Sequence, residues 1–240
     1  MTDLGWHAVS TPLTIAIDGP SGSGKSSVSR AVAIALGIGY LDTGAMYRAL
    51  TWWCLHTGID VADRSAVAAA AETMPLHQGS DPQEPTVVMD GHDIAGAIRS
   101  AEVTAAVSAV ATNTLVRPAL QRRQRAAMAR IATEAGGVVA EGRDITTVVA
   151  PDADVRVLLT ASEAARLARR AAELHGSAHP GAVDSTRAQI VDRDAADATV
   201  SNFTEAADGV VVVDTSDLDF EASVAEVLAV VAATRAGVTR

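Results

Sequence analysis

Lysine, cysteine and aromatic side chains are scarce in this sequence: one lysine, one cysteine and seven aromatic residues occur among 240. The single cysteine, Cys54, cannot form an internal disulfide, which favours a reducing compartment. No apolar run approaches the roughly 18 residues needed to cross a bilayer. The first ten residues also lack the basic-then-apolar order of a signal peptide. A cytoplasmic protein without a membrane partner is therefore expected.

An excess of positive charge is also missing. The formal net charge is −10, whereas a protein that binds DNA or RNA needs a basic surface for the phosphates. A nucleic-acid polymer is therefore not an expected partner. Apolar residues make up 48% of the chain, which is enough for a sizeable core. Their alanine-rich, aromatic-poor composition favours packed helices over an all-β sandwich.

Strand and helix patterns alternate along the chain. Continuous apolar runs are typical of strands that are covered on both faces of a parallel sheet, and segments with a helical period separate them. The expected strands are residues 13–18, 39–42, 138–140, 155–159 and 210–213, and the expected helices are residues 26–36, 45–56, 102–131, 162–174, 184–195 and 220–233. The sequence therefore predicts an α/β fold with a five-stranded parallel sheet.

Two features interrupt this regular order. Residues 61–100 are rich in turns, with a short strand at 86–89 and a hairpin-type turn at Asp90-Gly91, which indicates a small inserted unit. Within the long helical segment 102–131, Pro118 predicts a kink or a new helix start. A flexible loop is expected at residues 175–181.

The only lysine, Lys25, lies in a phosphate-binding loop. Residues 19–26 read GPSGSGKS and match G-x-x-x-x-G-K-[ST] at every specified position. A buried strand precedes the loop and a helix follows it, so its backbone N–H groups can cradle phosphate oxygens. Lys25 is expected to reach the β- and γ-phosphates of ATP, and Ser26 to offer its hydroxyl to Mg²⁺. The expected nucleotide-binding residues are Gly19, Pro20, Ser21, Gly22, Ser23, Gly24, Lys25, Ser26 and Ser27.

The rest of the sequence narrows the class of nucleotide-binding protein. A GTPase reads guanine with an Asn-Lys-x-Asp segment, which cannot exist here because the chain has no second lysine beside Lys25 of the loop. An ATP-driven motor carries a magnesium-binding aspartate after a strand, whereas here any acidic role after strand 138–140 belongs to Glu141. A small-molecule kinase remains, and arginines that neutralise the reacting phosphates are its expected signature.

Several longer segments resemble the bacterial cytidylate kinase family, one of the nucleoside monophosphate kinases with a phosphate-binding loop. The similarity extends from Thr14 to Asp214. It is carried by GPSGSGKSS at 19–27, DTGAMYR at 42–48, MDGHDIAGAIRSAEV at 89–103, VRPALQRRQR at 116–125 and VVAEGRDITTVV at 138–149. These segments together are far more specific than the phosphate-binding loop alone.

The resemblance implies one kinase domain over residues 1–240 and a set of acceptor-binding residues. Its core is expected at 13–60 and 136–235, its CMP-binding insertion at about 61–135 and a helical lid at about 162–197. Arg48 and Arg143 are expected to hold the acceptor phosphate, with Arg143 also catalytic. The other expected substrate-binding residues are Thr43, Tyr47, Ser108, Arg117, Asp144, Arg193 and Asp197. A monomer is expected.

Three arginines on one helix match the lid position of the family. Arg166, Arg169 and Arg170 are spaced i, i+3 and i+4 and so share a helix face. Such spacing is also usual on a solvated, salt-bridging face. As catalytic lid residues, they are expected to stabilise transition-state charge when the lid closes over ATP.

Two positions depart from the family pattern. The segment RDAADATV at 193–200 has Val200 where the family places a phosphate-binding arginine, and Thr146 stands where glycine is usual. The expected reaction is phosphoryl transfer from ATP to CMP or dCMP. A kinase of the same fold acting on UMP, AMP or shikimate is the nearest alternative, and a catalytically silent nucleotide-binding regulator is the alternative from another class.

Overall fold

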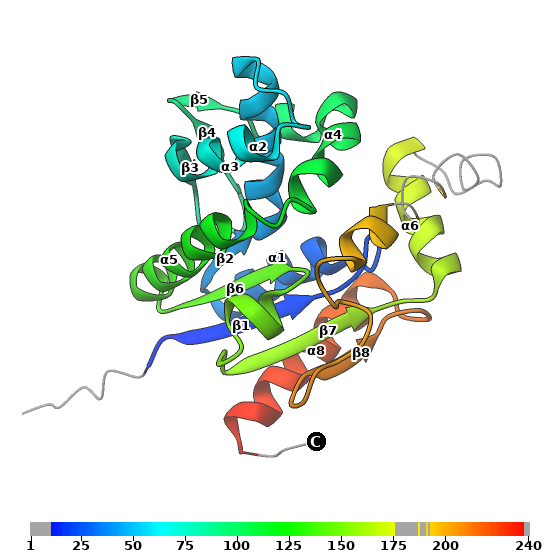
Figure 1. Ribbon diagram of the computed structural model, residues 1–240. Coiled ribbons are helices and arrows are strands. Elements are labelled where there is room, and N and C mark those ends of the chain that lie inside the picture. Colours follow the sequence, from blue (N-terminus) through cyan, green and yellow to red (C-terminus); the bar gives the residue numbers. More distant parts are fainter. Residues whose placement is uncertain (1–10, 176–186, 188–190, 192, 238–240) are drawn as a thin grey trace, which may run out of the picture.

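A computed structural model describes residues 11–175, 187, 191 and 193–237 (Figure 1). Its central element is a five-stranded parallel sheet in the order β2-β6-β1-β7-β8. The strands are β1 (Leu13–Asp18), β2 (Gly39–Asp42), β6 (Gly137–Gly142), β7 (Val155–Thr160) and β8 (Val211–Asp214). The predicted α/β fold with five parallel strands is confirmed, and β1 pairs with both β6 and β7 at the centre of the sheet.

Helices cover both faces of this sheet, which explains the continuous apolar runs of its strands. Ile15 and Ile17 of β1 face a core formed with α1 (Lys25–Leu36) and α8 (Phe220–Arg235). Ala16, between them, faces the opposite core, to which α5 (Arg117–Ala135) contributes Met128 and Ile131. Alternate residues of one strand thus pack against different helical layers.

The inserted unit lies beyond one edge of the parallel sheet (Figure 1). It holds a separate antiparallel sheet of three strands, β3-β4-β5. Asp90 and Gly91, at φ 50° and 78°, form the predicted hairpin turn. The unit's elements are α3 (Arg64–Thr73), β3 (Leu76–Gln78), β4 (Val87–Met89), β5 (His92–Asp93), a 3₁₀ turn (Ala97–Arg99) and α4 (Ala101–Ala111). The preceding helix, α2 (Thr43–Thr57), packs in the same hydrophobic core.

The helical segment expected over residues 102–131 is two helices, so of the two alternatives predicted at Pro118, a kink or a new start, the structure has the new start. α4 ends at Ala111 and α5 begins at Arg117, with Pro118 in its first turn, where the missing N–H of proline has no helical partner to lose. Leu120 of α5 packs in the core of the inserted unit, whereas Ile131 packs on the parallel sheet. α5 therefore joins the two units, and the division near residue 135 stays a prediction.

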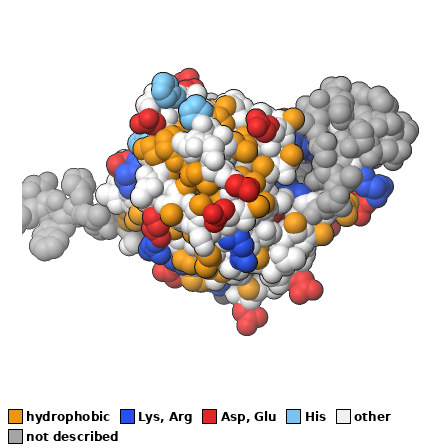
Figure 2. All heavy atoms as spheres, turned by 45° about the horizontal axis from the view of Figure 1, so that its top comes forward, with side chains coloured by type: hydrophobic (Ala, Val, Ile, Leu, Met, Phe, Trp, Pro, Cys, Tyr) orange, Lys and Arg blue, Asp and Glu red, His pale blue; other side chains and the backbone are white. Residues whose placement is uncertain are grey.

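The C-terminal third carries the remaining helices. α6 (Glu163–His175) follows β7, and residues 193–198 form a further helical segment. The expected loop at 175–181 and most of the expected helix at 184–195 lie outside the described residues. Among the described helices, none is both long and apolar enough to cross a membrane. On the face seen in Figure 2, acidic side chains are scattered among apolar and neutral ones.

Candidate active site

The phosphate-binding loop has the backbone conformation that its glycines allow. Gly22 and Gly24 adopt φ values of 77° and 87°, which other residues rarely tolerate. At Gly19, a Cβ atom would lie 2.2 Å from the carbonyl oxygen of Leu159. The loop therefore packs against β7 and leads directly into the N-terminus of α1, where unpaired backbone N–H groups can bind an anion.

Lys25 is held at the carboxyl edge of the sheet by a buried carboxylate. Its Nζ lies 3.6 Å from Oε2 of Glu141, which is 2% exposed. The hydroxyl of Tyr40 donates to the other carboxylate oxygen at 2.8 Å. Burial raises the pKa of Glu141, and the charge of Lys25 opposes that rise. Glu141, the acidic residue expected after strand 138–140, therefore lies beside the lysine of the loop.

A cavity of about 640 Å³ extends from this loop to the inserted unit. Most of the predicted nucleotide-binding and substrate-binding residues line it, although they come from distant parts of the chain. The predicted residues that line it are Pro20, Ser21, Gly22, Ser23, Gly24, Lys25, Ser26, Ser27, Thr43, Tyr47, Arg48, Arg117, Arg143, Asp144, Arg169, Arg170, Arg193 and Asp197. The parallel strands end at this edge, as expected for ligand binding in an open α/β sheet.

Three predicted residues are not in the cavity lining. Gly19, the first residue of the loop, lies against β7, and Arg166 contacts the loop from α6. On α4, the residues that face the cavity are Thr104, Val107 and Ala111. Ser108 is one turn along α4 from Thr104 and shares its side of the helix, but it is not among the residues that line the cavity. Its expected role in substrate binding stays a prediction.

Positive charge is concentrated in this cavity although the whole chain is acidic. Seven arginines and Lys25 line it. Arg48 is 9% exposed and donates to the carbonyl oxygen of Ile98 and the hydroxyl of Thr104. Burial, together with nearby Arg193 and Arg99, lowers the pKa of Arg48 to about 10. An anionic ligand would relieve this repulsion, so the cavity suits phosphate groups.

A charged pair lies at the end of the cavity formed by the inserted unit. Arg117 donates to Oδ2 of Asp144 at 2.7 Å. Gln121, one turn further along α5, donates to the same oxygen at 3.0 Å. Among the contacts of the described residues, both hydrogen bonds to Asp144 use Oδ2. The other oxygen, Oδ1, thus has acceptor capacity left for a donor on a ligand.

Arg143 is anchored by three side chains and an aromatic ring. Its Nε lies 3.0 Å from Asp197, and its two terminal nitrogens donate to Asp194 at 2.8 Å and to the hydroxyl of Ser21 at 2.7 Å. The guanidinium carbon lies 4.3 Å from the centre of the Phe203 ring. The orientation of Arg143 is therefore set before any ligand binds.

The three expected lid arginines have different surroundings. Arg169 and Arg170 line the cavity. Arg169 also donates to the carbonyl oxygens of Thr215 and Leu218. Arg166 donates to the carbonyl oxygen of Ser21 at 2.9 Å and to Asp194 at 2.5 Å. Arg166 thus contacts the phosphate-binding loop itself.

The unusual Thr146 has a clear structural partner. Its backbone N–H and its hydroxyl both donate to Oδ2 of Asp18, at 2.8 and 2.6 Å, and the N–H of Ile145 donates to Oδ1 at 2.9 Å. Burial raises the pKa of Asp18 despite these hydrogen bonds. Thr146 therefore ties the segment that carries Asp144 to the end of β1.

Replacing Thr146 with valine is expected to destabilise the protein by about 1–3 kcal/mol, because a buried hydrogen bond to a carboxyl group is lost. The measurement is the free energy of unfolding in urea. Thr133→Val is the matched control, since Thr133 is exposed and its hydroxyl bonds only within α5. Equal losses in the two variants would contradict the role of the Thr146 hydroxyl.

Four side chains near the site were not identified from the sequence. Gln121 and Asp194 fix predicted residues, Arg99 lines the cavity and pairs with Asp42 at 3.4 Å, and Phe203 packs on Arg143. Asp194 directly follows Arg193 in RDAADATV, one of the segments that depart from the family pattern. Phe203 is one of only two phenylalanines in the chain, and this scarcity is a signal that could have identified it.

The parallel sheet, the loop at the start of α1 and the arginine-lined cavity define a kinase with a phosphate-binding loop. A family model described as cytidylate kinase matches residues 15–233. The chain belongs to the cytidylate kinase family, and the predicted class of enzyme, a nucleoside monophosphate kinase, is confirmed.

Bacterial relatives agree with this assignment. The chain is 51% identical over 209 residues to a cytidylate kinase of Streptomyces avermitilis, covering 86% of this chain and 87% of the relative. It is 49% identical over 208 residues to one from Streptomyces griseus, covering 86% and 87%. It is also 49% identical over 213 residues to a cytidylate kinase of Cutibacterium acnes, covering 88% of this chain and 92% of the relative.

Proposed function

We propose that this protein transfers the γ-phosphoryl group of ATP to CMP and dCMP. One observation carries the proposal: a phosphate-binding loop and the Arg117–Asp144 pair line the same cavity. The loop suits a nucleoside triphosphate, and the pair suits the edge of a pyrimidine base. The relatives named above as cytidylate kinases support the same acceptor.

The hydrogen-bonding pattern of the pair favours cytosine over uracil. Cytosine has an amino donor at N4 and acceptors at N3 and O2. Oδ1 of Asp144 can accept from N4, while Arg117, which is 2.7 Å from Oδ2, supplies donors. Uracil carries a carbonyl at position 4, which would face the carboxylate. An unsatisfied buried polar group costs about 1–3 kcal/mol.

The acceptor phosphate and sugar are assigned to the cations between this pair and the loop. Arg48, Arg143 and Arg193 line the cavity there and would hold the phosphate of CMP. Burial and the charge of Arg143 lower the pKa of Arg193, so a bound phosphate would stabilise both. Asp197 lies 3.7 Å from Arg193 and is proposed to bind a ribose hydroxyl.

The donor side fits ATP with Mg²⁺. Mg²⁺ prefers oxygen ligands and keeps several waters when it binds phosphates. The oxygen donors that line the cavity with Lys25 include the hydroxyl of Ser26 and the carboxylates of Asp42 and Glu141, which are neighbours on the paired strands β2 and β6. Bound Mg²⁺ would neutralise charge on the donor phosphates. Ser26 is proposed as its protein ligand.

The chemistry is a direct in-line displacement. An oxygen of the CMP phosphate forms a bond to the γ-phosphorus of ATP as the bond to the bridging oxygen breaks, so that CDP and ADP result. Lys25 would neutralise charge on the transferred group, with Arg169 and Arg170 facing it from α6 and Arg143 from the acceptor side. Positioning and charge neutralisation provide the catalysis.

Product analysis tests the proposed reaction. With ATP, Mg²⁺ and CMP, chromatography is expected to find CDP and ADP in equal amounts, and dCDP when dCMP replaces CMP. Removal of Mg²⁺ with EDTA or omission of the acceptor should abolish ADP formation. No turnover at all would favour a catalytically silent nucleotide-binding regulator. ADP formation that does not depend on CMP would mean hydrolysis of ATP and would contradict the proposed transfer.

Replacing Val200 with arginine is expected to lower the KM for CMP by about tenfold, because a charge-assisted hydrogen bond to the acceptor phosphate would be gained. Val200 lines the cavity beside Asp197 and supplies neither charge nor donor itself. The measurement is KM for CMP at saturating ATP.

The neighbouring Thr199 offers a matched control. Thr199 is exposed, so Thr199→Arg adds the same charge outside the cavity and should leave KM unchanged. If the two variants have the same KM, position 200 does not contact the acceptor phosphate.

A further inference from the structure

Asp194 makes contacts that the proposed reaction does not use directly. Its Oδ1 accepts from Arg143 at 2.8 Å and from the backbone N–H of Ser21 at 3.2 Å. Its Oδ2 accepts from Arg166 at 2.5 Å. The carboxylate is 13% exposed, and Asp194 is not among the residues that line the cavity. It therefore lies behind the cavity wall, where it contacts residues that face ligands.

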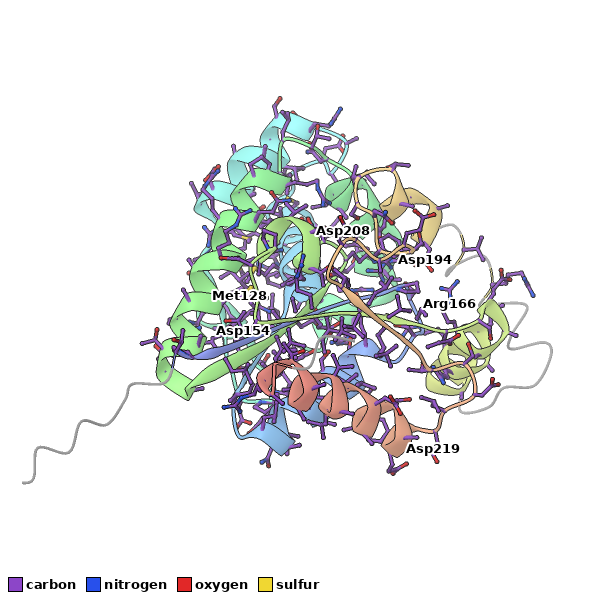
Figure 3. All side chains as sticks on the ribbon, turned by 90° about the horizontal axis from the view of Figure 1, so that it is seen from below. Met128, Asp154, Arg166, Asp194, Asp208 and Asp219 are labelled. Atoms are coloured by element: carbon purple, nitrogen blue, oxygen red, sulfur yellow. The ribbon has the colours of Figure 1, made fainter. Side chains whose placement is uncertain are left out.

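This carboxylate joins elements that bind the two substrates. Ser21 belongs to the phosphate-binding loop, Arg143 follows β6, and Arg166 extends from α6, which is the predicted lid helix. Figure 3 shows Arg166 and Asp194 near each other where α6 and the helical segment 193–198 meet. One side chain thus connects the donor-binding loop, an acceptor-binding arginine and the lid helix.

The link through Asp194 matters most for Arg143, because Arg143 also donates to the hydroxyl of Ser21 in the phosphate-binding loop. Asp194 and the Ser21 hydroxyl hold its two terminal nitrogens, and Asp194 also holds the Ser21 backbone. Movement of the loop relative to Arg143 must therefore break hydrogen bonds to this carboxylate. Phosphoryl transfer requires donor and acceptor phosphates within reacting distance, so this fixed relation has a functional consequence.

We propose that Asp194 is a positioning residue, which keeps the phosphate-binding loop, Arg143 and Arg166 in the arrangement that transfer between two bound nucleotides requires. The inference deepens the proposed function and rests on it. Burial alone would raise the pKa of Asp194. The charge of Arg143 and the surrounding hydrogen-bond donors nevertheless hold this pKa below its ordinary value. Asp194 thus stays ionised, as the ion pairs require.

Asp194→Asn tests this role, because asparagine keeps the shape and removes the charge. We expect kcat to fall about five- to tenfold, with KM for ATP and for CMP each changing less than about threefold. Calorimetric titration with ADP and with CMP should give dissociation constants close to those of the unmodified protein. Rates are compared well below the unfolding temperature, with the folded state checked by circular dichroism.

The matched control is Asp208→Asn, since Asp208 is exposed and does not line the cavity. It removes the same charge and should leave kcat unchanged. Equal kcat values in the two variants would overturn the inference. A higher kcat in Asp194→Asn would also overturn it, because the carboxylate would then restrain the arginines. Weaker nucleotide binding with a normal kcat would overturn it too, because it would indicate a role in binding.

A double-mutant cycle keeps the inference testable if Asp194→Asn folds poorly. Arg166→Gln removes the same ion pair from the other side, and the double variant is expected to lose much less than the product of the two single losses. Losses that multiply would contradict a shared role. If the unmodified protein does not phosphorylate CMP, the proposed function fails. If it does and these variants behave like the control, only the role of Asp194 fails.

Discussion

Replacing Lys25 with alanine is expected to lower kcat by about 10²- to 10³-fold, which is the loss that follows removal of one donor to transition-state charge. Lys25 lies at the start of α1 beside Glu141 and lines the cavity. Its charge should matter most as the γ-phosphoryl group moves, so kcat should fall more than the affinity for ATP. The measurement is kcat and KM for ATP at saturating CMP.

The fold should survive this substitution. Glu141 loses its cation but can take up a proton, since burial already raises its pKa. Arg122→Ala serves as the control, because Arg122 is an exposed cation paired with Glu72 on the surface, and its rate should stay normal. A near-normal kcat in folded Lys25→Ala would exclude the assigned role.

Replacing Asp144 with asparagine is expected to lower the CMP/UMP ratio of kcat/KM by about 10- to 100-fold, as a buried polar mismatch would do. Arg117 and Gln121 both donate to Oδ2, so they should hold the amide oxygen of asparagine at that position. The amide N–H₂ then takes the place of Oδ1. A donor would face the base, which suits the carbonyl of uracil.

The control for this variant is Asp152→Asn, an equivalent change at an exposed position outside the cavity. Its CMP/UMP ratio should match that of the unmodified protein. If Asp144→Asn also leaves the ratio unchanged, the base is read by other residues. A fall in activity toward CMP and UMP alike would mean that Asp144 supports the site without selecting the base.

The sequence was most informative where local signals agree. A buried strand, a glycine-rich loop and a helix start coincide at residues 13–36, and each appears in the structure within one residue of its predicted position. The helical segment 102–131 was less clear, because the period of α4 and α5 is alike on both sides of the break. Pro118 indicated the new start. Just past the end of α4, Asn113 donates to the carbonyl oxygen of Arg64, a contact 49 residues away in sequence that no local pattern reveals.

The candidate site could be predicted where a residue follows a strand of the parallel sheet. Arg143 and Asp144 lie directly after β6, so the topology brings them to the loop. The role of Asp194 could not be predicted, because its partners Ser21, Arg143 and Arg166 are 28 to 173 residues away in sequence. Ser108 illustrates a different limit, since it shares a side of α4 with Thr104 and still does not line the cavity.

Comparison of acceptors is the most direct test of the central claim. Release of ADP from ATP and Mg²⁺ is measured with CMP, dCMP, UMP, AMP and shikimate, each over a range of concentrations. We expect kcat/KM for CMP and dCMP to exceed that for each other acceptor by at least about tenfold, since the site has buried groups that match cytosine. An equal or higher value for UMP, AMP or shikimate, or no release with CMP, would contradict it.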